Sequence, residues 1–139
     1  MSRERGPGRP IDAEAKVRAY FERFNETRES QLETLDPEID WHIRADLPDS
    51  RTLRGYEDVR QRDADWKQAF GDLHLEPVEV SEASGKTVVV VHFHGHLKGS
   101  EDIVDMNEVW VLSWRGDRII GIREYKNKAE ALKAEGLET

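Results

Sequence analysis

Residues 87–125, TVVVVHFHGHLKGSEDIVDMNEVWVLSWRGDRIIGIREY, decide the fold. Their apolar residues largely alternate with polar ones, which is the period of a strand with one buried face. Two turn signals, Gly99-Ser100 and Arg115-Gly116-Asp117, divide the stretch. We therefore expect three consecutive antiparallel strands, over residues 87–97, 103–114 and 118–125, in a curved meander.

The chain upstream of this meander has helical spacing instead. An i, i+3, i+4, i+7 pattern predicts a helix that begins after Asp12. Its apolar members are Val17, Tyr20, Phe21 and Phe24. A second apolar stripe predicts a helix over residues 56–70, and its members are Tyr56, Val59, Trp66 and Phe70. Asp63 falls inside this stripe, where the spacing calls for an apolar side chain.

Shorter patterns fill the remaining sequence. Residues 39–45 alternate strictly and predict a half-buried strand after a short helical turn that holds Leu32 and Leu35. Residues 73–80 also alternate, and the break at Pro77 indicates a bulge or an edge strand. Residues 128–137 predict a last short helix with Gly136 near its C-terminal cap.

Together these elements predict one α+β domain, in which a curved antiparallel sheet wraps around the N-terminal helices. We place this domain at residues 12–137, and we expect residues 1–11, which are rich in Gly, Pro and Arg, to form a disordered tail. A length of 139 residues suits a single domain with a substantial core.

Composition excludes several classes of protein. The net charge of -8 and the pI near 5.2 argue against a nucleic-acid partner. No apolar run approaches the ~18 residues that a membrane span needs, and the N-terminus has no apolar signal segment. The chain has no Cys, which removes disulfides and thiolate chemistry. We expect a soluble, cytoplasmic protein.

Glu108 is the most informative residue of the meander. It lies in the middle of an apolar strand face, whose other members are Val104, Met106, Trp110, Leu112 and Trp114. Burial of a carboxylate is costly unless it is paired or hydrated, and it raises the pKa toward the range useful for acid–base catalysis. The alternative is that Glu108 pairs with an arginine, for instance Arg123 or Arg44, and only stabilises the sheet.

Glu124 on the last strand is the second candidate, and the register of the final hairpin decides whether it joins Glu108. A three-residue loop closing at Gly116 places Glu124 on the face of Glu108, whereas a two-residue Gly116-Asp117 turn places Arg123 and Tyr125 there. We favour the three-residue loop, because it aligns two apolar faces. The two acids would then lie about 5 Å apart and titrate as a coupled pair.

Asp63 is the third candidate acid, although a polar residue in a helical stripe can also lie at its rim or pair with Arg62 or a strand arginine. We interpret the large apolar residues that face the sheet or the helices as core or as the wall of a pocket. They are Tyr20, Phe24, Trp41, Trp66, Phe70, Met106, Trp110 and Ile122.

Three histidines at alternate positions, His92, His94 and His96, share one strand face. The outer two would lie about 13 Å apart, which is too far to share one metal ion. Two of them could still bind a metal with a carboxylate from elsewhere in the chain. We favour a polar sheet face or a subunit interface as the role of these histidines, and we expect no metal cofactor.

The ordered set of motifs resembles the SnoaL-like branch of the nuclear transport factor 2-like superfamily, which includes ketosteroid isomerases, limonene-epoxide hydrolases and polyketide cyclases. The resemblance covers about residues 12–137. The matching segments are YFERFN at 20–25, LDPEIDW at 35–41, RGYEDVR at 54–60, VVVV at 88–91 with Gly99-Ser100, and REY at 123–125 before AEAL at 129–132.

The resemblance implies a cone-shaped sheet around a mainly apolar cavity, a small apolar ligand, and a homodimer formed through the outer sheet face. The catalysts among the relatives use one or two carboxylates, sometimes with histidine or tyrosine, to move protons on apolar substrates. In the cyclases an acidic residue on the last strand and a histidine on the preceding strand move the proton. By position, Glu124 is similar to that acidic residue and Glu108 to that histidine. A carboxylate thus replaces the imidazole. The resemblance implies a cofactor-free isomerase, cyclase or hydrolase, or a non-catalytic binding or assembly module on the same fold.

Overall fold

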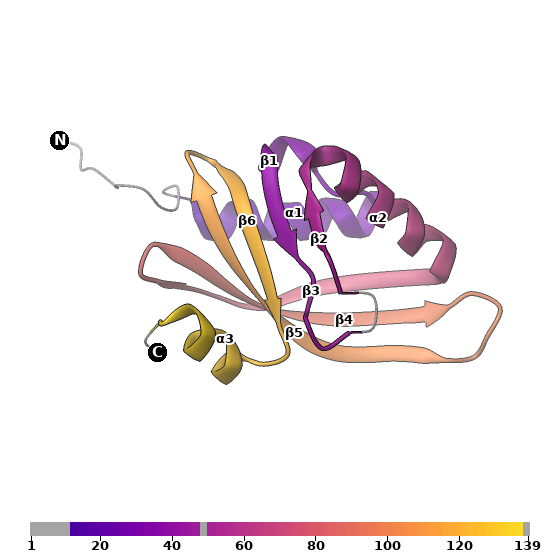
Figure 1. Ribbon diagram of the computed structural model, residues 1–139. Coiled ribbons are helices and arrows are strands. Elements are labelled where there is room, and N and C mark those ends of the chain that lie inside the picture. Colours follow the sequence, from indigo (N-terminus) through magenta and orange to yellow (C-terminus); the bar gives the residue numbers. More distant parts are fainter. Residues whose placement is uncertain (1–11, 48–49, 138–139) are drawn as a thin grey trace.

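The computed structural model describes residues 12–47 and 50–137, so the predicted disordered tail at 1–11 lies outside the described residues. Helices and strands alternate early in the chain, and hairpins follow (Figure 1). The elements are α1 (Ala13–Thr27), η1 (Leu32–Thr34), β1 (Leu35–His42), β2 (Thr52–Arg54), α2 (Gly55–Ala69), β3 (Phe70–Ala83), β4 (Lys86–Leu97), β5 (Ile103–Arg115), β6 (Arg118–Tyr125) and α3 (Lys128–Glu135).

The six strands form one curved sheet in the order β2-β1-β6-β5-β4-β3. All neighbours are antiparallel except β1 and β6, which pair in parallel. The inner face packs against α1 and α2, whereas α3 lies on the other face, where Ala131 belongs to one hydrophobic cluster with Val88, Val109 and Val111 (Figure 1). The predicted α+β architecture, with a curved sheet around the N-terminal helices, is confirmed.

The final hairpin corrects the predicted loop. Arg115 pairs with Arg118 around a two-residue turn, and Gly116 there has φ +65°. The register then shifts beyond Trp114, because Ser113 pairs with Gly121 and leaves an extra residue in β6. The predicted three-residue loop is wrong, but this bulge has the same consequence, since it brings Glu124 opposite Trp110 on the inner face.

Two other elements differ from those predicted from the sequence. β1 begins at Leu35 and ends at His42, because its parallel pairing with β6 includes Leu35 opposite Ile119. β2 was not predicted, since it is only three residues long. The break at Pro77 is a bulge, as expected, and it leaves Val78 exposed. Asp12 occupies the N-cap of α1 without a side-chain hydrogen bond to the helix.

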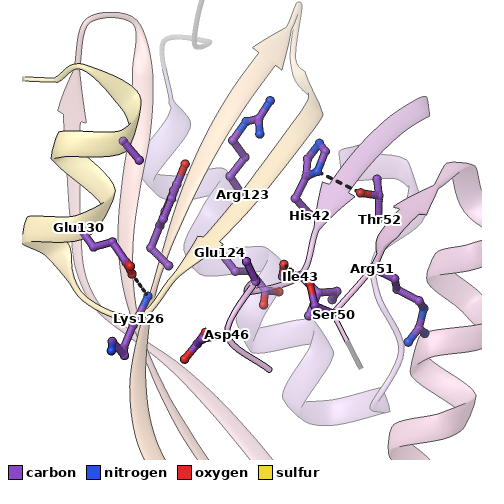
Figure 2. A pocket seen from close by; sticks show the side chains of 13 residues that line it. His42, Ile43, Asp46, Ser50, Arg51, Thr52, Arg123, Glu124, Lys126 and Glu130 are labelled. Carbon is purple, nitrogen blue, oxygen red and sulfur yellow. Dashed lines mark hydrogen bonds between the residues drawn. The ribbon is translucent and has the colours of Figure 1, made fainter. Parts of the chain in front are cut away.

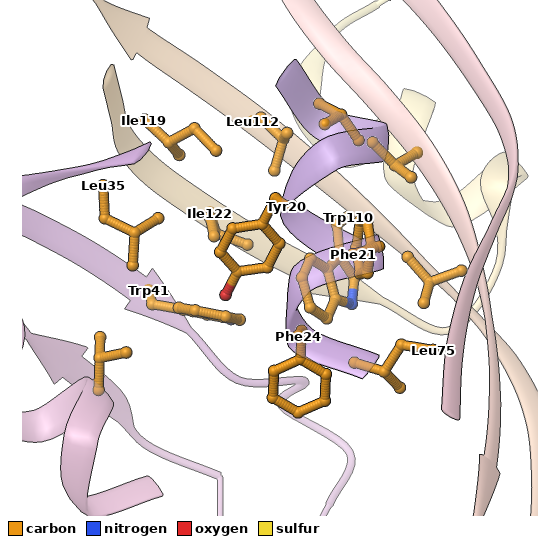
Figure 3. Packing of buried hydrophobic residues seen from close by; sticks show 14 of the residues in the cluster. Tyr20, Phe21, Phe24, Leu35, Trp41, Leu75, Trp110, Leu112, Ile119 and Ile122 are labelled. Atoms are coloured by element: carbon orange, nitrogen blue, oxygen red, sulfur yellow. The ribbon is translucent and has the colours of Figure 1, made fainter. Parts of the chain in front are cut away.

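Aromatic rings fill the space between α1 and the sheet (Figure 3). Trp110 packs against Phe21 and Trp41, with ring centroids 5.3 and 5.1 Å apart. Tyr20 and Phe21 meet edge to face. The α1 side of the inner layer is thus closely packed, and a larger open space lies further along the sheet.

Gly95 shapes that further end of the sheet. A Cβ at this position would lie 2.8 Å from Cδ1 of Phe70. The missing side chain lets the Phe70 ring lie against β4, next to Phe93, with ring centroids 5.6 Å apart.

Within residues 12–47 and 50–137, no helix has the length and apolarity needed to cross a bilayer.

Candidate functional site

A cavity of about 160 Å³ lies between α2, the inner face of the sheet and the segment that follows β1. Most of its wall is apolar, and four ionisable side chains interrupt that wall. Its lining residues are Ile43, Leu47, Arg51, Arg62, Trp66, Phe70, Phe93, Val104, Met106, Glu108 and Glu124. The cavity therefore combines apolar surface with buried charge, which is the usual composition of a small-molecule site.

Glu124 reaches this cavity from β6, and its register opposite Trp110 turns the side chain inward. The residue is buried, and Trp41 Nε1 donates a hydrogen bond to its carboxylate at 2.7 Å. Burial and the nearby charge of Glu108 raise the pKa of Glu124 to about 7, although Arg62 and the bond from Trp41 act in the opposite direction. A carboxyl group with this pKa can both accept and release a proton near neutral pH.

Glu108 projects from β5 into the same cavity but is held by two partners. Arg44 Nη1 lies 3.4 Å from one carboxylate oxygen, and Trp110 Nε1 donates to the other at 3.0 Å. Arg44 also binds Asp46 through two nitrogens, at 3.0 and 2.7 Å. Glu108 is thus linked to Asp46 through Arg44, and both Glu108 and Arg44 are buried. This is the pairing with an arginine that was the alternative to a catalytic role.

The two acids are diagonal neighbours on adjacent strands. Trp110, not Glu108, lies directly opposite Glu124, so the direct cross-strand contact of about 5 Å expected from the sequence does not form. The electrostatic coupling remains, because the charge of Glu108 contributes to the raised pKa of Glu124. Glu124 is therefore the member of the pair whose pKa is raised, and Glu108 supplies a neighbouring charge.

Asp63 lies elsewhere. Its two carboxylate oxygens accept hydrogen bonds from the backbone N–H and the hydroxyl of Ser30, at 2.7 and 3.0 Å. It lines a different pocket, of about 310 Å³, with Glu29 and Lys67 among the neighbours. Burial raises the pKa of Asp63, and the bonds from Ser30 lower it. This contact ties the segment after α1 to α2, and it keeps Asp63 apart from Glu108 and Glu124.

The apolar residues proposed as pocket wall divide into two groups. Trp66, Phe70 and Met106 line the cavity that holds the two acids. Tyr20, Trp110 and Ile122 surround a void of only about 10 Å³, and Phe24 and Trp41 are fully packed in the core. Burial raises the pKa of the Tyr20 hydroxyl, which hydrogen-bonds Ser30.

Sequence reasoning did not place Arg62 in the wall of this cavity, and it named Arg44 only as one possible ion-pair partner of the acids. Arg62 lies three residues after Val59 and four before Trp66, so the same helical spacing that drew attention to Asp63 also placed Arg62 on the buried stripe. Arg44 follows β1 and turns inward to Glu108. Its burial depends on the end of that strand, and the strand pattern alone does not give this end.

The three histidines lie on the outer face of β4. Asp105 on β5 hydrogen-bonds both His92 and His94, at 2.7 and 3.3 Å. The side chains of His92, His94 and Asp105 are 37%, 45% and 56% accessible. Across the described part of the chain, no group of three or more His, Cys, Asp or Glu side chains is arranged to hold a metal ion.

A second and wider pocket, of about 660 Å³, borders the first between β6, α3 and the segment from Ile43 to Thr52 (Figure 2). Figure 2 shows Glu124 and Ile43 near its centre, and these residues line both pockets. The backbone N–H of Lys126 donates to Glu130 at 3.0 Å and holds the start of α3 at the rim. The acid with the raised pKa thus borders both the smaller cavity and the wider pocket.

Comparison with solved structures places this architecture among known folds. A protein from Catenulispora acidiphila DSM 44928 with a ketosteroid isomerase-like fold, solved with trimethylamine, aligns with a TM-score of 0.70 and 17% identity over 88% of this chain and 93% of its own. A candidate SnoaL-like polyketide cyclase from Jannaschia sp. CCS1 aligns with a TM-score of 0.68 and 19% identity over 96% of both chains.

The epoxide hydrolase/cyclase-like enzyme SalBIII, which has a role in pyran ring formation in salinomycin, aligns with a TM-score of 0.67 and 18% identity, over 84% of this chain and 91% of its own. At such identities the likeness concerns the fold alone. No curated protein matches the sequence significantly. The family model described as the SnoaL-like domain matches residues 17–122, which is most of the chain. The chain therefore belongs to the SnoaL-like domain family.

Proposed function

We propose that this protein binds a small, mainly apolar molecule in the cavity beside α2 and that Glu124 transfers a proton to or from it. The observation that carries the proposal is a carboxyl group with a pKa of about 7, buried at the wall of an apolar cavity. A group with a pKa near the working pH is the most effective general acid or base. The reaction class is isomerisation, cyclisation or hydrolysis without a metal or an organic cofactor.

The two acids have different parts in this proposal. Glu124 has no arginine within ion-pair distance among the described residues, so its proton can move without breaking a salt bridge. Glu108 stays bound to Arg44 and Trp110. Burial is the main cause of the raised pKa of Glu124, and the negative charge of Glu108 adds to it, so Glu108 acts through Glu124 rather than carrying the proton itself.

Hydrogen–deuterium exchange tests the proposal without knowledge of the natural substrate. A panel of small cyclic and aryl ketones is incubated with the protein in D₂O, and proton NMR follows the loss of the signals next to the carbonyl. We expect catalysed exchange for at least one ketone, at the same rate with or without a chelator. Absence of exchange above the buffer rate for every ketone would contradict the assignment of Glu124 as a carbon acid–base.

A non-catalytic binding module is the second candidate, and the ion pair between Glu108 and Arg44 favours it. In that case ligands bind in the cavity but are released unchanged. Glu124→Gln would then alter the affinity for a ligand without altering any rate, and ketone exchange would stay at the buffer level.

We also propose a homodimer formed through the outer sheet face, as the family resemblance implies. The exposed Ile103, 58% accessible, lies on this face of β5. We expect the wild-type protein to sediment as a dimer and Ile103→Glu to sediment as a monomer, because a charge in an apolar contact opposes association. A wild-type protein that sediments as a monomer at all concentrations would refute this proposal.

A further inference from the structure

Arg62 is a buried cation that lacks a good acceptor. Its side chain is almost completely buried, and neither Nε nor Nη1 has a hydrogen-bond partner. Its one ion pair among the described residues is with Asp63, at 3.9 Å, which is too long for a hydrogen bond. Both oxygens of Asp63 are already bound to Ser30. The protein itself therefore leaves much of this guanidinium unsatisfied.

Two tryptophans fix the position of the Arg62 guanidinium. Its Cζ lies 4.4 Å from the ring centroid of Trp41 and 3.9 Å from that of Trp66. Cation–π contacts of this kind hold the faces of the guanidinium, whereas its N–H groups point outward from the edge. A planar donor group is thus clamped in place at the wall of the cavity that also holds Glu108 and Glu124.

The chemistry of this group indicates what it binds. Buried polar groups in folded proteins are nearly always hydrogen-bonded, so a buried charge without a protein acceptor calls for one from outside the chain. Guanidinium binds planar oxygen acceptors best, through two parallel N–H donors. A hydrocarbon or an amine would leave Arg62 unsatisfied, whereas a carbonyl or carboxylate oxygen would satisfy it.

We propose that Arg62 binds the carbonyl or carboxylate oxygen of the small molecule that occupies this cavity. The inference rests on the proposed function only in its use of the cavity as the ligand site. It narrows the substrate class to apolar molecules with a C–H bond next to a carbonyl group, and it disfavours simple alkenes and epoxides.

The proton transfer is balanced within this arrangement. Ionised Glu124 takes the proton from the carbon next to the carbonyl, the electron pair of the C–H bond forms a C=C bond, and the carbonyl π pair moves onto oxygen. The enolate oxygen lies against the Arg62 guanidinium, which stabilises the new negative charge. Neutral Glu124 then returns the proton to the same carbon or to another, so that no oxidant or reductant is needed.

Benzoate binding tests the inference directly. Apolar cavities of about 150 Å³ can hold benzene, so a benzoate ring suits a cavity of this size. Calorimetric titrations at pH 6, where the raised pKa keeps Glu124 mostly protonated, compare benzoate with benzyl alcohol. We expect benzoate to bind wild type more tightly than benzyl alcohol does, and Arg62→Met to weaken benzoate binding about 10–100-fold while sparing benzyl alcohol.

Arg60→Met is the matched control, because Arg60 is exposed on the same helix and lies outside this cavity. It should leave benzoate affinity unchanged within about twofold, since a distant exposed charge contributes little. The inference is overturned if wild type binds benzoate no better than benzyl alcohol, or if Arg62→Met binds benzoate as tightly as wild type.

A crystal structure of the wild-type complex with benzoate gives an answer even if Arg62→Met fails to fold. We expect the carboxylate within hydrogen-bond distance of Arg62, and a carboxylate bound to Arg51 or outside the cavity would overturn the inference. These results separate the two proposals. Benzoate bound at Arg62 without any ketone exchange would support the binding role of Arg62 and refute the catalytic role of Glu124. Ketone exchange without benzoate bound at Arg62 would refute only the binding role of Arg62.

Discussion

Glu124→Gln is expected to lower the rate of proton exchange on a responsive ketone by about 10²–10⁴-fold, the usual contribution of a general acid or base. Glutamine keeps the shape of the side chain, and its carbonyl oxygen can still accept the hydrogen bond from Trp41. It cannot take up a proton near neutral pH. The measurement is the initial rate of deuterium incorporation followed by NMR, with saturating ketone.

The control for this experiment is Glu22→Gln, the same chemical change at an exposed position of α1. This variant should exchange the ketone at the wild-type rate. A Glu124→Gln protein that is folded and equally active would show that another group carries the proton.

Glu124→Gln should also change how stability depends on pH. The pKa of this carboxyl group is about 7 in the folded protein, compared with an ordinary value of 4.5. The folded state therefore binds the proton more tightly than the unfolded state does. The free energy of unfolding of the wild type should fall as pH rises from about 4.5 to about 7, by about 3 kcal/mol, and then level off.

A glutamine at position 124 does not titrate, so the variant lacks this fall. The variant should gain stability relative to wild type through the same pH window and keep the advantage above it. Urea unfolding at several pH values measures the difference, and Glu22→Gln again serves as the control. A constant difference between variant and wild type from pH 4.5 to 8 would mean that the folded Glu124 has an ordinary pKa.

The hydrophobic periods of the sequence predicted the architecture well, because helices at one face of a meander have few ways to bury their apolar stripes. The hairpin register was harder. The sequence pattern near Gly116 offered a two-residue or a three-residue loop, and a bulge in β6 reconciled the shorter loop with Glu124 on the inner face. Bulges are a matter of local strand pairing, and single-strand alternation does not reveal them.

The site also contains some residues that the sequence predicted and others that it did not. Glu108 and Glu124 stood out because an acid on an apolar strand face is conspicuous, and both are buried at the same cavity. Asp63 stood out for the same reason but turns to Ser30 instead. The arginines were named only as possible ion-pair partners, since a long cationic side chain normally extends to solvent, and only the fold shows that Arg44 and Arg62 turn inward.

A buried carboxyl group whose pKa lies near neutrality is the physical basis of the whole account, and NMR titration of ¹³C-labelled glutamate side chains tests it directly. We predict that the Glu124 carboxyl carbon titrates with a midpoint near 7 and that Glu108→Gln lowers this midpoint, because it removes a neighbouring negative charge. A midpoint near 4.5 in the wild-type protein would contradict the account.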